Sequence, residues 1–334
     1  MQGLAISKLI PWKALALLVA GLIVLGLLIQ QQGVALIGTQ LGQVGPVFLA
    51  ILGLTFFFLF LQTFAWQVIL KDNKGSFWSL FKIKAGGDAL NALLPFSLIG
   101  GTAVQDHLLR ERHQVQAGAD SIVIDRNVQN LAVMIFVWVG LIVGFLNALQ
   151  LPATVRIGVP FLLLLVGIFF VVAIRTGGPG FFAPVMRRLG DLGLPFGKSA
   201  SCRGHVQETD RLLLQFYQQR SGAFYQALFL QLLCQGLMVA EVYLIGRAIF
   251  AEFSPALALL LAAATPLITG LFTIIPGAFG ILELIYAGIL MLAFGGIGAA
   301  AGITIVLVRR ARALVWIIVG MILTGNPFRM FLKP

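Results

Sequence analysis

Residues 306–323 read VLVRRARALVWIIVGMIL, an apolar stretch that contains Arg309, Arg310 and Arg312. With the residues from 297 onward it is long enough for a membrane-spanning helix, which needs about 20 predominantly apolar residues. The first arginine lies about 12 residues into that helix, roughly 18 Å along its axis. A charge at the bilayer centre costs at least ~2.5–3.5 kcal/mol on insertion scales, so an intramembrane charge is a candidate for function. The stretch predicts a membrane fold and a polar site within it.

The rest of the chain has the composition of a membrane protein. Apolar residues make up 59% of the sequence and charged residues 10%, against about 25% charged in an average soluble domain. We predict an all-α fold, a polytopic transmembrane helix bundle that forms one integral membrane domain over residues 1–334. The predicted spans are residues 13–30, 46–70, 119–148, 155–174, 221–248 and 297–324.

Basic residues are segregated between the predicted loops. A net charge of +11 would suggest nucleic-acid binding in a soluble protein. Here residues 30–45, 147–152 and 295–299 contain no Lys or Arg, whereas residues 175–220 and both chain ends are basic. Positively charged loops stay in the cytoplasm. We therefore expect a multi-pass protein of the cell inner (plasma) membrane, with both termini and the loop 175–220 cytoplasmic and no nucleic-acid partner.

Two apolar segments are broken rather than continuous. Residues 85–104 contain Gly86-Gly87, Pro95 and Gly100-Gly101, and basic residues flank this segment on both sides. A segment with both ends in the cytoplasm cannot cross once, so we expect it to enter and turn back, which requires cover for the freed backbone groups. The second segment, residues 256–295, is interrupted by Pro266, Pro276, Gly277 and Gly280.

Each break is succeeded, at a similar distance, by a helix that contains arginine. Pro95 lies 31 residues before Arg126, and Pro276 lies 33 residues before Arg309. The charge pattern places the first break on the cytoplasmic side and the second on the opposite side, which is typical of an inverted-topology repeat with a site between broken helices. The alternative is chance, because Pro and Gly are common in transmembrane helices.

Polar residues within the apolar segments are the candidate transport pathway. Glu283 follows the second break and is the expected partner of one of the arginines. Arg309 and Arg312 share a helix face, while Arg310 points elsewhere. The alternative is that the last helix ends early and its arginines are a cytoplasmic anchor. The predicted pathway residues are Asp88, Asn91, Pro95, Arg126, Glu241, Pro276, Gly277, Gly280, Glu283, Arg309 and Arg310.

Some of these polar residues also have a purely structural interpretation. Asp125 and Arg126 are neighbours in the sequence and could neutralise each other. Gln231 and Gln235 lie one turn apart before Glu241, and amides in membrane helices usually form interhelical hydrogen bonds.

The sequence offers no enzyme site. Three histidines, His107, His113 and His205, are too dispersed for a metal site, and no glycine-rich loop follows a strand. The loop 175–220 is too small for an independent catalytic domain. We expect no enzymatic activity, no cofactor and no metal.

Five stretches resemble the transmembrane region of the lysylphosphatidylglycerol synthases and their stand-alone, flippase-like relatives. The likeness is greatest to membrane proteins associated with hopanoid biosynthesis. The synthases carry a large soluble C-terminal domain that this sequence does not contain, so aminoacyl transfer is not expected. The resembling stretches are NALLPFSLIGG (91–101), IDRNVQN (124–130), AEVYL (240–244), IPGAFGILE (275–283) and LVRRARALVWIIVG (307–320).

The resemblance implies a lipid flippase or transporter with re-entrant helices. Our first hypothesis is that the protein moves a polar-headed lipid, anionic or hopanoid-related, between membrane leaflets. One alternative is a transporter for a small solute or ion, since the same architecture suits ions. Another is a non-catalytic assembly factor for lipid synthesis, with homo-oligomers or lipid-synthesis enzymes as partners.

Overall fold

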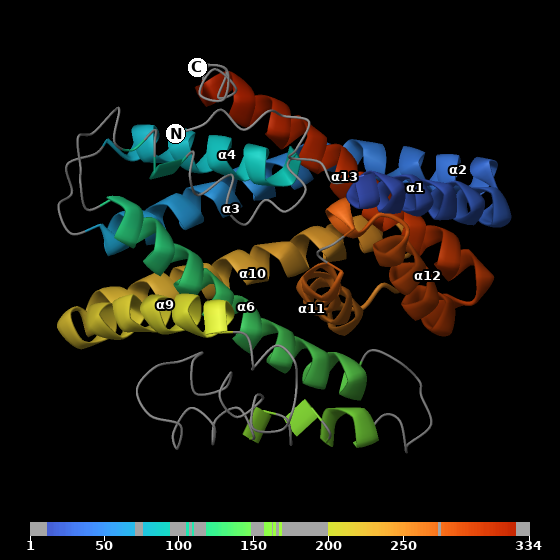
Figure 1. The fold of residues 1–334 in the computed structure, drawn as a ribbon. Coiled ribbons are helices and arrows are strands. Elements are labelled where there is room, and N and C mark those ends of the chain that lie inside the picture. The colour runs from blue at the N-terminus through green and yellow to red at the C-terminus, as the bar shows by residue number, and fades with distance from the viewer. Residues whose placement is uncertain are drawn as a thin grey trace.

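The computed structural model describes residues 12–70, 76–93, 105–106, 109, 118–147, 157–161, 163–164, 167–168, 200–272 and 275–324. In these ranges every regular element is a helix, which confirms the all-α prediction (Figure 1). The helices are α1 (Trp12–Gln32), α2 (Val34–Val44), η2 (Gly45–Val47), α3 (Phe48–Ile69), α4 (Phe77–Leu93), α6 (Gly118–Asn147), α9 (Ala200–Gln219), α10 (Ser221–Ile249), α11 (Pro255–Leu271), η4 (Pro276–Ala278), α12 (Ile281–Phe294) and α13 (Gly296–Thr324).

Three helical stretches are long and apolar enough to cross a membrane within the described ranges. They are residues Val34–Ile69, Asp120–Asn147 and Ser221–Ile249. Shorter apolar helices cover Val19–Gln32, Pro255–Leu271 and Ile281–Phe294. The protein is therefore a multi-pass membrane protein. The predicted span at 155–174 and the first part of the loop 175–220 lie largely outside the described residues, whereas the end of that loop forms α9.

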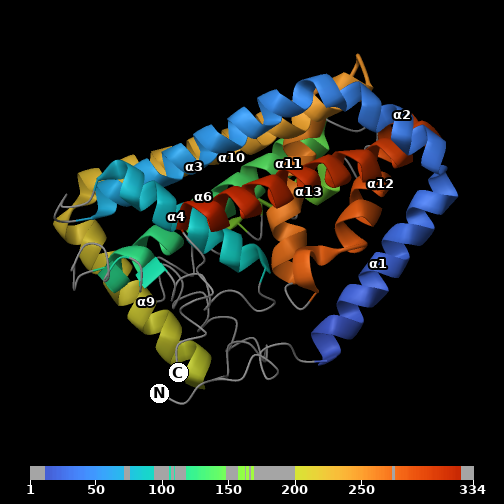
Figure 2. The same cartoon turned by 90° about the horizontal axis from the view of Figure 1, so that it is seen from above.

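Helices α3 and α10 form an antiparallel pair along one side of the molecule (Figure 2). Arg220, directly before α10, donates hydrogen bonds to the carbonyl oxygens of Ile69 (3.0 Å) and Val68 (3.2 Å) at the end of α3. At the opposite end of the pair, Ile51 of α3 shares a hydrophobic core with Val242 of α10. This pair defines two ends of the bundle.

The short helices α4 and α11 begin at opposite ends of this pair. Helix α4 follows the end of α3, and α11 follows the end of α10. Both contain 17 residues. The distance along the chain from the start of each to the start of the next long helix is 41 residues, from Phe77 to Gly118 and from Pro255 to Gly296. The spacing supports the predicted repeat and its inverted arrangement.

The short helix of each repeat packs against the long helix of the other repeat: α4 packs along α13, and α11 packs along α6. A Cβ atom on Gly320 of α13 would lie 2.5 Å from the carbonyl oxygen of Ala85 in α4. A Cβ atom on Gly140 of α6 would lie 2.5 Å from Cβ of Ala263 in α11. Ala85 and Ala263 are each the ninth residue of their helix. Small residues thus permit close approach at equivalent places.

The second broken segment is a helical hairpin. Phe294 at the end of α12 stacks on Phe250, which directly follows α10, with ring centroids 4.4 Å apart, so the chain returns to the end where the segment started. At the turn, Gly277 and Gly280 have φ angles of +61° and +80°. Gly280 also packs so closely that a Cβ would lie 2.8 Å from the carbonyl oxygen of Gly21 in α1. Only glycine suits both demands at this position.

The first broken segment is described in part. Gln105 packs against Gly87 of α4, and Leu109 shares a core with Leu80 and Ile83 nearer the start of that helix. Both of these described residues therefore lie against α4. Pro95 and Gly100-Gly101 lie outside the described residues.

Three expectations about helix boundaries were wrong. Gly86-Gly87 does not break α4, because the missing side chains leave room for Thr324 and Gln105 against the helix. Pro266 lies inside α11 without ending it. The predicted loop at 30–45 is helical except at Gly33, whose φ of +91° separates α1 from α2.

Candidate functional site

Arg309 lies in the middle of α13 and connects it to both helices of the hairpin. Its Nη1 donates to Oγ1 of Thr265 in α11 (2.9 Å) and to the hydroxyl oxygen of Tyr286 in α12 (2.8 Å). The Tyr286 hydroxyl in turn donates to the carbonyl oxygen of Leu261 (2.9 Å). Because α13 continues to Thr324 and Arg309 is buried, the alternative of an early helix end with an anchoring arginine is wrong.

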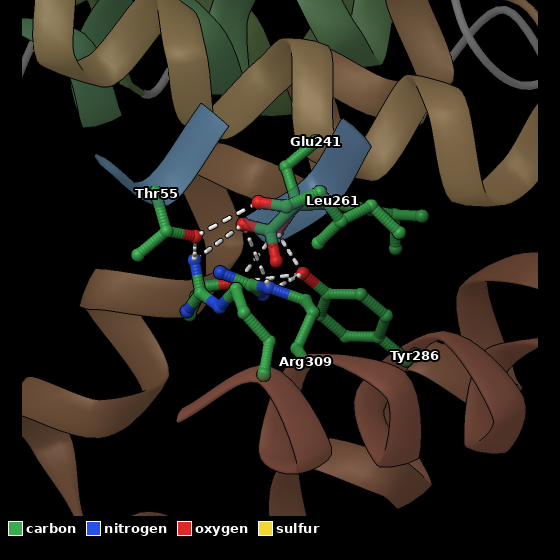
Figure 3. A network of polar contacts seen from close by, with 8 residues as sticks. Thr55, Glu241, Leu261, Tyr286 and Arg309 are labelled. Atoms are coloured by element: carbon green, nitrogen blue, oxygen red, sulfur yellow. Dashed lines mark hydrogen bonds and ion pairs between the residues drawn. The ribbon is translucent and has the colours of Figure 1, made fainter. Parts of the chain in front are cut away.

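Glu241 of α10 is the carboxylate between two of the arginines (Figure 3). Its Oε2 accepts from Nη1 of Arg312 at 2.9 Å and lies 3.7 Å from Nε of Arg309. Arg312 also reaches Oγ1 of Thr55 in α3, at 3.4 Å. The prediction that Arg309 and Arg312 share a face is confirmed. Glu241 is only 1% exposed, so the charges meet away from solvent.

Arg310 points to another carboxylate, as expected. Its Nε donates to Oε1 of Glu283 at 2.6 Å, and the guanidinium carbon lies 3.7 Å from the ring centroid of Phe279. Oε2 of Glu283 accepts from the backbone N–H of Gly280 at 2.9 Å. Glu283 therefore fixes the hairpin turn and neutralises an arginine of α13 at the same time.

Positive charge exceeds negative charge in this arginine cluster, which consists of Arg309, Arg310, Arg312, Glu241 and Glu283. Three guanidinium groups face two carboxylates, and the N–H groups at Nη2 of Arg310 and Nε of Arg312 are buried without a hydrogen-bond partner in the described part of the chain. Oε1 of Glu241 is likewise unpartnered there. An unsatisfied buried polar group costs about 1–3 kcal/mol, so the cluster retains capacity for an anionic group.

A second buried ion pair joins α4 to α6. Nζ of Lys84 lies 2.5 Å from Oδ2 of Asp125, and Nε2 of Gln231 in α10 donates to Oδ1 of the same carboxylate at 3.2 Å. Lys84 was not predicted as a site residue, because it lies among the cytoplasmic lysines, yet its side chain is only 2% exposed. Asp125 pairs with Lys84 and not with Arg126, so the predicted neutralisation between sequence neighbours was wrong. The predicted interhelical hydrogen bond of Gln231 is confirmed.

Arg126 is half-buried and, like Asp125, contacts α4. Its Nη2 lies 3.9 Å from Oδ1 of Asp88, and its Nη1 donates to Oε1 of Gln129 at 3.5 Å. Asn91 lies three residues after Asp88 on α4 and is also half-buried. These residues lie near the Lys84–Asp125 pair and not in the arginine cluster.

The predicted pathway residues that the structure describes therefore fall into two groups, and each group contacts a different residue of α10. Gln231 contacts the Lys84–Asp125 pair, and Glu241, about 15 Å further along the helix axis, contacts the arginine cluster. Gly277 and Gly280 form the hairpin turn, and Pro276 begins η4. Pro95 lies outside the described residues.

The described side chains offer no group of three or more His, Cys, Asp or Glu residues that could hold a metal ion. The cluster chemistry is instead that of guanidinium groups, which bind carboxylates and phosphates through charge-assisted hydrogen bonds.

Neither the curated proteins nor the solved structures contain a significant match to this chain. A family profile described as "Lysylphosphatidylglycerol synthase TM region" matches residues 13–320. This match covers most of the chain, including α4, the hairpin and the arginines of α13. The chain is therefore a member of the lysylphosphatidylglycerol synthase transmembrane-region family.

Proposed function

We propose that the protein moves a polar-headed lipid between the two leaflets of the membrane, as a transporter and not as an enzyme. The observation that carries the proposal is the buried contact of Glu241 with Arg309 and Arg312, which lies among predominantly apolar helices. Charges inside a membrane protein commonly mark a substrate or ion pathway. Membership of a membrane family is consistent with this role.

The lengths of the short helices support a re-entrant arrangement. Helices α4 and α11 have 17 residues each, about 25 Å at ~1.5 Å per residue. The hydrocarbon core of a bilayer is about 30 Å thick. Two such segments that begin at opposite ends of the α3–α10 pair would end inside the bilayer, where irregular backbone is tolerated only if protein or water covers it. In the second segment, Glu283 and α1 provide that cover.

In the proposed mechanism, the headgroup loses its contacts with water and binds the arginine cluster, while the acyl chains stay in lipid. The surplus positive charge compensates an anionic headgroup, and Arg310 is the most exposed of the three arginines, at 19% of its side chain. The chain has no nucleotide-binding motif, so the energy would come from an ion gradient or transport would be passive.

Reconstitution with fluorescent lipids tests the proposal. Wild-type proteoliposomes should scramble at least one headgroup faster than empty liposomes, and Arg309→Met should lose most of that rate. Leu49→Trp, at a 78% exposed position of α3, serves as a control that should keep it. Rates equal to those of empty liposomes across several headgroups would reject lipid transport and leave small-solute transport as the alternative to examine.

The cellular setting forms part of the same proposal. We place the protein in the cell inner membrane with both termini cytoplasmic, and we expect membrane lipids, hopanoid-related or anionic, as its ligands. Homo-oligomers or contacts with lipid-synthesis enzymes are proposed partners. Comparing the lipids of each leaflet after deletion of the protein would identify the transported class, and unchanged leaflets would argue against it.

A further inference from the structure

Helix α1 lies at the edge of the bundle and is attached to it by a narrow line of contacts. Its main contacts are with α2, α12, η4 and α13, and Figure 2 shows it beside α12 on the outside of the molecule. Among residues 19–32 only Gly21 and Leu25 are buried, and they lie one helical turn apart. The opposite side of α1 is apolar and exposed, as at Ile23 and Leu27. Most of its surface therefore faces away from the rest of the protein.

The contact of α1 with the hairpin turn is mainly one of backbone with backbone. A Cβ atom on Gly21 would lie 2.5 Å from the carbonyl oxygen of Phe279, and a Cβ atom on Gly280 would lie 2.8 Å from the carbonyl oxygen of Gly21. Neither glycine has a side chain that interlocks with the other surface. Leu25 adds one apolar side chain, in a core that it shares with Ala287 of α12. The two surfaces can therefore separate without repacking an extensive set of side chains.

A single glycine joins α1 to α2. Gly33 has φ +91° and ψ 117°, a conformation that residues with a side chain rarely adopt, and nothing lies within 4 Å of the position of its Cβ. Its N–H donates to the carbonyl oxygen of Ile29 at 3.1 Å. Beyond the glycine, Oγ1 of Thr304 in α13 donates to Oε1 of Gln40 in α2 at 2.8 Å. Helix α2 is thus anchored to the bundle, and the backbone at Gly33 has room to turn.

The hairpin turn under α1 carries the ring that covers Arg310. The guanidinium carbon of Arg310 lies 3.7 Å from the ring centroid of Phe279, the residue whose carbonyl oxygen meets Gly21. Arg310 is 19% exposed, and its Nη2 is buried without a hydrogen-bond partner in the described ranges. In this arrangement a headgroup has little access to the arginine. Movement of α1 away from the turn would free Phe279 on that side.

We infer that α1 is a lateral gate, which pivots at Gly33, lifts off the hairpin turn and opens a route from the lipid phase to Arg310. The structure holds the closed position. The inference rests on the proposed function for the lipid that passes the gate, whereas the movement of α1 is measured without any transport.

Pairs of spin labels on the full-length protein in lipid nanodiscs measure this movement by double electron–electron resonance. One label is placed at Leu284→Cys on α12 and the other at Val19→Cys or Leu27→Cys on α1, all exposed positions, in a variant without Cys202 and Cys234. Val19 lies 14 residues from the hinge and Leu27 lies 6, or about 21 Å and 9 Å at ~1.5 Å per residue. Opening should therefore displace Val19 roughly twice as far as Leu27. Equal displacements would overturn the pivot.

A wedge variant and its matched control populate the two positions of the gate. Gly21→Leu puts a side chain against the carbonyl oxygen of Phe279 and should shift the label distances to longer values. Gly26→Leu adds the same side chain on the same helix, where nothing lies within 4 Å of the Cβ position, and should keep the parent distances. If Gly21→Leu does not fold, Gly21→Ala and Gly26→Ala give the same comparison. Distances that agree between wedge and control would reject the gate.

Scrambling by the same variants separates this inference from the proposed function. The wedge variant should scramble about twofold faster or more than its control, because the rate scales with the fraction of open molecules. Longer label distances without faster scrambling would reject α1 as the entry route while wild-type transport stands. If no variant scrambles, the proposed function is rejected, and the label distances still decide whether α1 moves.

Discussion

Oε1 of Glu283 accepts a hydrogen bond from Nε of Arg310 at 2.6 Å, while the other oxygen of this carboxylate holds the hairpin turn. Glu283 is fully buried. One side chain therefore couples the charge of α13 to the conformation of the broken segment. Changing that charge should affect both.

Glu283→Gln tests this coupling. The amide oxygen can still accept from Gly280, but Arg310 loses its counter-charge, and removal of one partner of a buried pair costs about 3–5 kcal/mol. Because Arg310 is 19% exposed, we expect the lower end of that range as a fall in unfolding temperature. Scrambling should also fall at normal expression. Unchanged scrambling would mean that the Glu283–Arg310 pair is not needed for transport.

The double variant Glu283→Gln/Arg310→Gln and its two single variants form a double-mutant cycle that measures the interaction between the two side chains. Removing both charges avoids an unpaired ion, so the double variant should be more stable than the sum of the two single changes predicts. The interaction should be about 1–3 kcal/mol, measured by unfolding in detergent. Strict additivity would mean that the two side chains do not interact in the folded protein.

Lys84→Met should destabilise the protein through Asp125. The carboxylate would remain buried with only the hydrogen bond from Gln231, so we expect a loss of about 3 kcal/mol or more. Adding Asp125→Asn should restore part of that loss, because a neutral amide is cheaper to bury. The control is Lys82→Met, two residues away at an exposed position. Equal unfolding temperatures for the Lys84 and Lys82 variants would contradict the buried pair.

Larger side chains at the α4–α13 and α11–α6 contacts should destabilise the packing between the two repeats. Gly320→Leu would collide with Ala85 of α4, and Gly140→Leu would collide with Ala263 of α11. Each should cost about 1–3 kcal/mol as overpacking. Gly53→Leu is the matched control because nothing lies within 4 Å of the position of its Cβ. Similar unfolding temperatures for all three variants would count against these two contacts.

Opposite insertion of the short helices predicts opposite labelling. Ser76 precedes α4 and Glu252 precedes α11, and both are exposed. In a variant without Cys202 and Cys234, Ser76→Cys should react with an impermeant maleimide from the cytoplasmic side only. Glu252→Cys should react only from the other side. Labelling of both positions from the same side would exclude the inverted arrangement.

The arginine cluster could be predicted because its signal is local. Three arginines within an apolar run indicate a polar site in that helix. The three-residue spacing places Arg309 and Arg312 on one face of it. Glu283 was recognisable from its place after the Pro-Gly break. The sequence predicted a pairing with one of the arginines, and the structure identifies that arginine as Arg310.

Lys84 shows where a sequence argument fails. It lies among lysines that follow the positive-inside pattern, and only the tertiary fold buries it beside Asp125 of α6. The effect of Gly86-Gly87 was misjudged for the same reason. Glycine pairs weaken an isolated helix, but here tertiary contacts with Thr324 and Gln105 exploit the missing side chains. Both features depend on neighbours that are remote in the sequence.

The reciprocal packing of α4 on α13 and of α11 on α6 has a consequence for biogenesis. Each short helix packs against a long helix from the other repeat. When only the first half of the chain has been synthesised, α4 therefore lacks its contact with α13. Helix α4 then stays in the translocation machinery or among lipids until α13 emerges. The contact between α4 and α13 therefore forms after α11 can already pack on α6, when the last long helix has been synthesised.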